Sequence, residues 1–463
     1  MTEQRYDAIV VGAGPAGIFA AIELIRLRPG SRILIVERGK PIEKRACPAR
    51  QTHCVSCPTC AIMTGWGGAG AFSDGKLTLS TEVGGWLGDF VGPARLEELV
   101  DDSDRLWLEF GATTEVHAPE PAEEERLVRA ATLAGMRLVP MRIRHIGSDR
   151  SPAVLGAMHD YLSGAGVEVR TGTAAESILA EAGRVTGVRL ADGTAALSGI
   201  VIAAPGRDGA DWLSGQARDL GIGLVNNAVD IGVRVEVPAP VMEPLTDHLY
   251  EAKLIRYSHA FGDQVRTFCM NPYGEVTTES YGDIITVNGH SYADTKTDNT
   301  NFAVLVSQSF THPFQEPITY GTSIARLANL LGEGILVQRL GDLRAGRRST
   351  AKRIASSVVV PSLPSATPGD LSFVLPYRHL ANILEFLEAM DELAPGVADD
   401  GTLLYGIEVK FYSSRLELGP DLQTPVRGLF AIGDGAGVTR GLIQSGASGL
   451  VAARAAHAVL DAE

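Results

Sequence analysis

The apolar positions near the N-terminus are grouped in an order that predicts a strand, a turn, a helix and a second strand. Ala8–Val11 is an apolar run with the length of a buried strand, and after a glycine-rich turn apolar residues recur at helical spacing as far as Ile25. A second apolar run, residues 33–36, ends at the acidic residue Glu37. Together these segments predict one βαβ unit.

The turn of this unit has the glycine spacing of a site for an adenine dinucleotide. Gly12 lets the chain leave the strand, Gly14 lets the backbone approach a pyrophosphate, and Gly17 lets the helix pack against the strand. The unpaired N–H groups at the helix start favour negative charge. Glu37 follows Gly17 by twenty residues, a position at which a carboxylate can accept hydrogen bonds from ribose hydroxyls.

A second strand, turn and helix are predicted near the C-terminus. Residues 428–449 read GLFAIGDGAGVTRGLIQSGASG and continue into an alanine-rich helix that reaches Asp461. The apolar residues 429–432 predict a strand that delivers Asp434 to its carboxyl end, where open α/β sheets bind their ligands.

The middle of the chain divides into two patterns. Residues 167–173 and 199–206 resemble the strands that lie beside the adenine and beneath the cofactor in FAD-binding flavoproteins, and residues 151–165 resemble the helix that precedes them. From about 221 to 400 the pattern changes, with strands predicted at residues 230–237, 264–270 and 284–287. No second glycine fingerprint with strand, helix and acid occurs there, so any NAD(P)H is expected to dock only transiently.

The composition says less about the fold than about which kinds of partner the protein can bind. The 463 residues are 45% apolar, which is typical of a globular enzyme, and the net charge is −14. An acidic surface gains no counterion release from nucleic acid or from an anionic membrane, so neither is expected as a partner. No apolar stretch is long enough to span a bilayer, and the N-terminus lacks a basic leader. We therefore expect a cytoplasmic protein.

The N-terminal and C-terminal motifs together resemble the paired signatures of the flavoprotein group that includes glutathione reductase and p-hydroxybenzoate hydroxylase. The resemblance implies FAD and an α/β fold, with a discontinuous Rossmann-like FAD-binding domain (residues 1–90, 140–220 and 400–463). It also implies a helical excursion at 91–139 and an inserted α+β substrate domain at 221–399. Its implied cofactor-binding residues are Gly12, Gly14, Pro15, Ala16, Gly17, Glu37, Arg38, Gly67, Gly68, Ala69, Ala174, Ala204, Gly206, Gly433, Asp434 and Gly437.

Over almost its whole length the chain resembles a more specific group, the uncharacterised FAD-dependent dehydrogenases (NAD(P)/FAD-dependent oxidoreductases) of bacteria. The segments that carry this resemblance are residues 46–77 (ACPARQTHCVSCPTCAIMTGWGGAGAFSDGKL), 144–149 (RHIGSD), 230–238 (DIGVRVEVP), 265–276 (VRTFCMNPYGEV) and 287–291 (VNGHS). The resemblance implies fold and cofactor, but it names no substrate.

Four of the five cysteines, Cys47, Cys54, Cys57 and Cys60, lie within fourteen residues. The last three have the spacing of a bacterial ferredoxin run, which predicts an iron–sulfur cluster, and four thiolates also suit zinc. A further alternative is that two of the thiols exchange electrons with the flavin, which requires a lowered thiol pKa. Reduced cysteines that pack apolar surface are the remaining alternative.

Two arginines and one histidine are candidates for substrate binding and proton transfer. Arg234 and Arg266 lie in predicted strands and can bind a substrate carboxylate through two parallel hydrogen bonds, or form structural salt bridges. His290, expected on a loop, is the best histidine for proton transfer because its unperturbed pKa is near neutrality. A structural or surface histidine is the alternative.

Tyr273 and Glu408 are the other catalytic candidates. Tyr273 precedes a glycine, and Glu408 lies in the strand predicted at residues 405–411. Glu408 can serve as a base, or as the ion-pair partner of Lys410 or Arg415.

These patterns favour an FAD-dependent oxidoreductase that transfers a hydride between flavin N5 and a small organic molecule, as a dehydrogenase or as a double-bond reductase. A flavin monooxygenase shares the discontinuous FAD domain and is the main enzymatic alternative. An electron-transfer flavoprotein with a redox protein partner, or a tRNA-modifying flavoprotein, is the alternative from another class.

Overall fold

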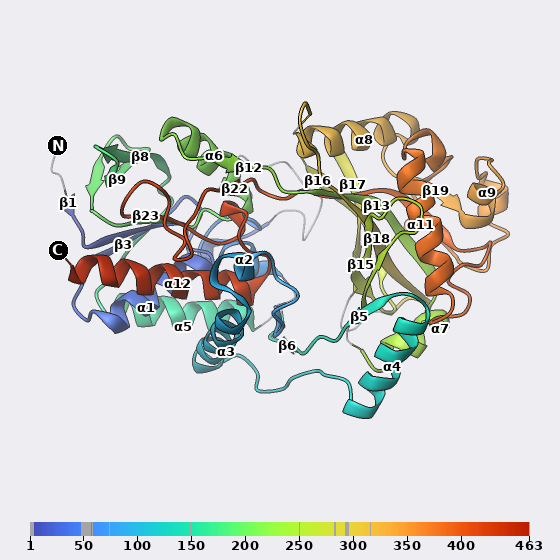
Figure 1. Cartoon of the computed structure of the whole chain (residues 1–463), viewed down its shortest axis with the longest axis horizontal. Helices are drawn as coiled ribbons and strands as arrows, with labels where there is room; N and C mark the ends of the chain where they lie inside the picture. Colours follow the sequence, from blue (N-terminus) through green and yellow to red (C-terminus); the bar gives the residue numbers. More distant parts are fainter. Residues whose placement is uncertain are drawn as a thin grey trace. The chain divides into compact units, whose positions relative to one another are not determined.

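The chain folds into two units, each assembled from separate stretches of sequence (Figure 1). The computed structural model describes residues 4–47, 57, 59–73, 75–147, 150–249, 251–281, 284–291, 296–314 and 316–462. Unit 1 comprises Met1–Val116, Arg142–Asn227 and Ser413–Glu463, and unit 2 comprises His117–Met141 and Ala228–Tyr412.

Unit 1 contains a five-stranded sheet in the order β23-β11-β2-β3-β7, with every neighbouring pair parallel. Its strands are β2 (Ala8–Val11), β3 (Ile33–Glu37), β7 (Glu168–Thr171), β11 (Val201–Ala203) and β23 (Leu429–Ala431). The associated helices are α1 (Pro15–Leu27), α3 (Pro93–Glu109), α5 (Ser151–Gly164), α6 (Ala210–Asp219) and α12 (Leu442–Asp461). A second sheet pairs β1 (Gln4–Arg5), β10 (Ala195–Leu197), β9 (Arg184–Leu190) and β8 (Ala175–Glu181).

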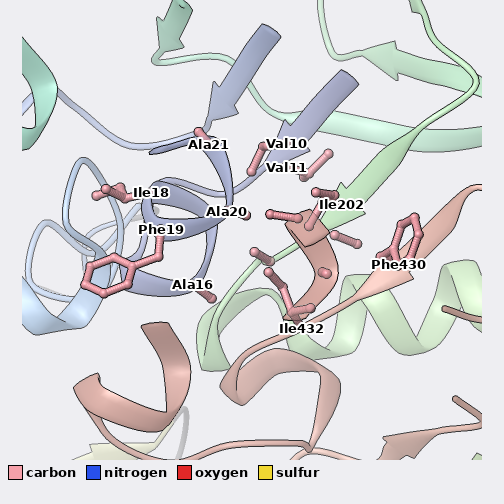
Figure 2. Close-up of a cluster of buried hydrophobic side chains, with 14 of the residues drawn as sticks. Val10, Val11, Ala16, Ile18, Phe19, Ala20, Ala21, Ile202, Phe430 and Ile432 are labelled. Atoms are coloured by element: carbon pink, nitrogen blue, oxygen red, sulfur yellow. The ribbon is translucent and has the colours of Figure 1, made fainter. Parts of the chain in front are cut away.

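Helices α1 and α12 lie side by side because small residues line their contact (Figure 1). A Cβ atom on Gly449 of α12 would lie 2.3 Å from the carbonyl oxygen of Ala16, so only glycine allows this approach. Apolar side chains of β2, α1, β11 and β23 gather into one core cluster, which Figure 2 shows from Val10 to Ile432. This core fixes the strand ends from which the site is built.

Unit 2 is built on an eight-stranded sheet in the order β20-β19-β21-β13-β18-β15-β14-β5. The strands are β5 (Arg137–Val139), β13 (Val229–Pro238), β14 (Lys253–Tyr257), β15 (Gln264–Asn271), β18 (Asn299–Gln308), β19 (Leu336–Arg339), β20 (Thr367–Pro368) and β21 (Leu403–Lys410). A separate hairpin pairs β16 (Glu275–Tyr281) with β17 (Ile284–His290). Helices of this unit include α4 (Pro121–Leu133), α7 (Ala239–Thr246), α8 (Pro317–Gly332) and α11 (Tyr377–Met390).

The two faces of strand β13 differ in chemistry although every residue before Pro238 is buried. The side chains of Ile231, Val233 and Val235 belong to the apolar core that includes residues of α8 and α11. Asp230, Arg234 and the other alternate residues lie on the opposite face, since successive side chains of a strand point to opposite sides. Along β13, the sheet of unit 2 therefore has one apolar face and one charged face, and the second is called the charged face below.

The structure confirms most of the predicted elements and moves several boundaries. The strands predicted at 230–237 and 264–270 are β13 and β15. The last segment of unit 1 begins at Ser413 and not at residue 400, because β21 pairs with β13 and β19 of unit 2. The excursion expected at 91–139 is divided, with α3 in unit 1 and α4 in unit 2. In the described ranges, no helix is both long and apolar enough to cross a membrane.

Candidate functional site

A cavity of about 430 Å³ lies where parallel strands β2, β3, β11 and β23 of unit 1 end. Of the sixteen residues expected to bind the cofactor, all but Gly17, Gly67 and Gly437 line it, which leaves thirteen. Those thirteen are Gly12, Gly14, Pro15, Ala16, Glu37, Arg38, Gly68, Ala69, Ala174, Ala204, Gly206, Gly433 and Asp434.

The turn after β2 is as tight as the glycine spacing predicts. Gly12 has φ +103°, and a Cβ atom there would lie 2.1 Å from the carbonyl oxygen of Ala204. A Cβ atom on Gly17 would lie 2.0 Å from the carbonyl oxygen of Gly12, so Gly17 allows α1 to pack onto the turn. Helix α1 starts at Pro15, and its positive dipole end therefore lies at the cavity wall, where it favours an anion.

Glu37, at the end of β3, holds three backbone segments together. Its Oε2 accepts a hydrogen bond from the N–H of Ala13 (2.9 Å), and Oε1 accepts from Gly39 (2.8 Å) and Gly65 (2.9 Å). A carboxylate oxygen can accept two hydrogen bonds, so Oε2 keeps one acceptor position for a ligand hydroxyl. Glu37 is 6% exposed and lines the cavity.

Arg45 holds the glycine-rich loop that forms another wall, and sequence analysis missed it. Its Nε donates to the carbonyl oxygen of Ala61 (2.9 Å), Nη1 to those of Trp66 (2.7 Å) and Gly68 (2.8 Å), and Nη2 to that of Ile62 (2.8 Å). Burial lowers the pKa of Arg45 to about 10, so the guanidinium remains charged at neutral pH. Its acceptors are main-chain carbonyls, which no motif in the sequence reveals.

The second carboxylate of the cavity belongs to Asp434. Gly433 has φ +74°, which turns the chain after β23. The Oγ1 of Thr439 donates to Oδ1 of Asp434 (2.9 Å), and Nε of Arg207 lies 3.8 Å from Oδ2. Burial raises the pKa of Asp434 above its usual range, with Arg207 opposing the shift.

The donor set fits a dinucleotide that carries a flavin. A helix N-terminus can face a diphosphate, and Glu37 and Asp434 offer acceptors at two strand ends for sugar or ribityl hydroxyls. The cavity also has wall residues that the motifs do not identify, namely Val11, Val36, Met63, Thr64, Gly70, Ser73, Lys76, Ala175, Pro205, Arg207, Gly209, Trp212, Gly441, Leu442 and Ser445.

Arg234 and Glu408 of unit 2 form a fully buried ion pair. Arg234 binds both oxygens of Glu408, at 2.7 and 2.8 Å, and donates its remaining N–H groups to Cys269, Asn301 and Asn288. All five donors are therefore used, which corrects the expectation that Arg234 binds a substrate carboxylate.

Glu408 also forms an ion pair with Lys410. This pairing is one of the two structural roles that we considered for Glu408 besides that of a catalytic base. Nζ of Lys410 lies 3.3 Å from Oε1 of Glu408. Burial alone would raise the pKa of Glu408, but Arg234 and Lys410 lower it below its usual range. A carboxylate held in this charged form is a weak proton acceptor.

The other catalytic candidates contact other side chains. Arg266 contacts Asp230 and donates to the hydroxyl of Tyr412 (2.8 Å). The hydroxyl of Tyr273 donates to Oε1 of Glu243 (2.8 Å). His290 is exposed and ends strand β17, where it pairs with Glu275, and so it is not on the loop that we expected.

The cysteine cluster is only partly described. Cys54 lies outside the described residues, whereas Cys57 is exposed and Cys47 and Cys60 are half-buried. In the part of the chain that the structure describes, no group of three or more His, Cys, Asp or Glu side chains is placed to hold a metal ion. The iron–sulfur and zinc hypotheses remain predictions.

Residues 228–411 match the family model described as FAD-dependent protein, C-terminal domain-like. An uncharacterised protein of Clostridium beijerinckii is 27% identical over 475 residues, which cover 97% of this chain and 80% of that protein.

Similarity to solved structures is weak. The 3-ketosteroid-delta4-(5alpha)-dehydrogenase of Rhodococcus jostii RHA1 is 13% identical with a TM-score of 0.45, over 99% of this chain and 98% of that one. The glycine oxidase of Geobacillus kaustophilus is 14% identical with a TM-score of 0.36, over 99% and 94%. The family match, which covers residues 228–411, and the cavity of unit 1 support an FAD-dependent oxidoreductase.

Proposed function

We propose that this oxidoreductase transfers a hydride between flavin N5 and a small organic substrate, as a dehydrogenase or as a reductase of a double bond. The supporting observation is the cavity of unit 1, in which a glycine turn, a helix start and two carboxylates meet at the ends of parallel strands. When bound, FAD supplies a two-electron donor and acceptor.

The residues of unit 1 would bind and orient that cofactor. The start of α1 would face the diphosphate, the remaining acceptor position of Glu37 would take a ribose hydroxyl, and Asp434 would hold the ribityl chain. This arrangement supports the finer assignment to the glutathione reductase and p-hydroxybenzoate hydroxylase type of domain. His290 and Tyr273 stay candidates for proton transfer within this proposal.

An anaerobic titration of the purified protein with NADH and then NADPH, followed by visible absorbance, tests the function. Bleaching of the flavin bands by either nucleotide identifies a transient nicotinamide donor and a reductase. Bleaching only by an organic substrate identifies a dehydrogenase. Absence of stoichiometric flavin from protein refolded with FAD would contradict the proposal.

Admission of air separates the alternatives. Oxygen consumption that matches a hydroxylated product would replace the proposal with a monooxygenase. Reoxidation only by an added redox protein would replace it with an electron-transfer flavoprotein.

A further inference from the structure

The charged face of the unit 2 sheet contains one lysine whose ammonium has no direct partner among the described residues. Lys253 starts β14, and within the described residues its ammonium makes neither a hydrogen bond nor an ion pair. Its side chain is mostly buried and points to the face that also carries Arg266. Burying an ammonium away from water without a hydrogen-bond or ion-pair partner costs free energy. A buried lysine without such a partner is therefore a candidate site for a bound anion.

Strand pairing brings Lys253 and Arg266 together. Ile255 of β14 lies opposite Arg266 of β15, so Lys253, two residues away on the same face, is the diagonal neighbour of Arg266. Diagonal neighbours in a sheet are about 7–8 Å apart at the backbone, within reach of two long side chains.

Arg266 has donors to spare. Only its Nη2 is used, towards Asp230 and the hydroxyl of Tyr412, while Nε and Nη1 have no partner among the residues that the structure describes. Its side chain is 11% exposed. Arg234, by contrast, has used all five N–H groups.

A half-buried aromatic ring lies beside these cations. The guanidinium carbon of Arg266 is 4.9 Å from the centre of the Phe268 ring, and Nζ of Lys410 is 5.8 Å from it. Phe268 follows Arg266 by two residues in β15 and therefore lies on the same face of the strand. A flat ligand can rest on such a ring while its charged end reaches the cations.

The neighbouring cations contact carboxylates directly, whereas Glu251 and Asp230 act on Lys253 without a hydrogen bond or ion pair to it in the described part of the chain. Asp230 neutralises Arg266, and Glu408 and Glu279 each lie 3.3 Å from Nζ of Lys410. Lys253 therefore has no carboxylate in direct contact among the residues that the structure describes. The carboxylate of a ligand would supply that contact.

We propose that this face of unit 2 binds a planar monocarboxylate, with the carboxylate held by Lys253 and the unused donors of Arg266 and the flat part against Phe268. The inference deepens the proposed function, on which it rests for naming this ligand the substrate class of the oxidoreductase.

Calorimetry on the FAD-loaded protein tests the site, with benzoate as the probe and benzamide as its uncharged counterpart. We expect benzoate to bind and benzamide to bind at least about tenfold more weakly, because a charge-assisted contact contributes about 1.5–3 kcal/mol. Lys253→Met should weaken benzoate roughly tenfold to a hundredfold. The matched control Lys352→Met removes an exposed lysine of the same unit and should change the affinity by less than about twofold.

The pH dependence gives a second readout that needs no variant. Burial and Arg266 lower the pKa of Lys253 to about 8, with Arg137 acting in the same direction and Glu251 and Asp230 opposing. Benzoate affinity of the unmodified protein should therefore fall as the pH rises above about 8. An affinity that is flat to pH 10, or equal binding of benzoate and benzamide, overturns the site.

Failure of the site and failure of the proposed function are distinguishable. A protein that holds FAD and is reduced, but that fails to bind benzoate at millimolar concentration, loses the carboxylate site alone. A protein without FAD overturns the proposed function, and calorimetry with benzoate then still reports on unit 2. If Lys253→Met does not fold, the benzoate affinity of Lys253→Gln and the pH dependence of the unmodified protein decide whether the site exists.

Discussion

Gly12 is the residue on which the tight turn of the cofactor cavity depends. A methyl group there would lie 2.1 Å from the carbonyl oxygen of Ala204 on a backbone of φ +103°. We expect Gly12→Ala to abolish FAD retention, measured as flavin absorbance per chain after gel filtration. In Gly156→Ala, the matched control in α5, the new methyl has no neighbour within 4 Å, and the change should be neutral or stabilise by up to about 1 kcal/mol. Full flavin content in Gly12→Ala would contradict the predicted site.

His379 makes the stability of unit 2 sensitive to acid. The ring is 2% exposed, neither nitrogen has a hydrogen-bond partner among the described residues, and burial lowers its pKa from 6.5 to about 4. The unfolded chain binds the proton more tightly than the folded chain does. The contribution of His379 to the free energy of unfolding is therefore fully present above pH 6.5, and about 3 kcal/mol of it is lost as the pH falls towards 4.

Urea unfolding between pH 7 and pH 4 checks this expectation. His379→Leu should remove the part of the pH dependence that this ring contributes. His259→Leu removes an exposed imidazole of the same unit and should leave the dependence almost unchanged. Equal slopes for His379→Leu and the unmodified protein would refute the assignment.

At the scale of elements, Arg45 and Glu37 hold the loop between Cys60 and Gly68 from two sides. Arg45→Met would remove the donor from one buried and three partly buried carbonyls. We expect at least about tenfold faster FAD release and a lower Tm. Arg45→Lys should rescue only in part, because an ammonium has three donors and no planar fork. The control Arg189→Met removes an exposed arginine of β9 and should release FAD at the rate of the unmodified protein. If Arg45→Met released FAD at that same rate, Arg45 would not hold the loop in the way that we propose.

Helices and strands with a regular repeat of apolar residues could be predicted from the sequence. Strand ends that depend on hydrogen bonding to a distant strand could not. The run Ala8–Val11 and the alternation along β13 mark their strands directly, since burial decides them locally. His290 is flanked by glycine and serine, which indicates a loop, but pairing with β16 extends β17 to include it. Long-range pairing thus overrides local propensity there.

At the scale of the whole molecule, all four tryptophans lie in unit 1, so their fluorescence reports on that unit alone. FAD that binds only the folded unit stabilises it by mass action, by about 2.7 kcal/mol when free FAD is at 100 times its Kd. The tryptophan-detected unfolding midpoint in urea should therefore rise with FAD concentration. A midpoint independent of FAD would contradict binding in unit 1. Far-UV circular dichroism, which follows both units, is the control.

The sequence alone determined the dinucleotide turn, the acid Glu37 and the second turn at Asp434, because each depends on residues that are neighbours along the chain. The tertiary structure decided which charges remain available. Arg234 and Arg266 look alike in the sequence, yet the first has used every donor and the second has not. Arg45 and Lys253 stand out only after folding, since their environments come from the loop carbonyls and the strand register that fold around them. Contacts between residues distant in sequence set the electrostatics, and local pattern does not encode them.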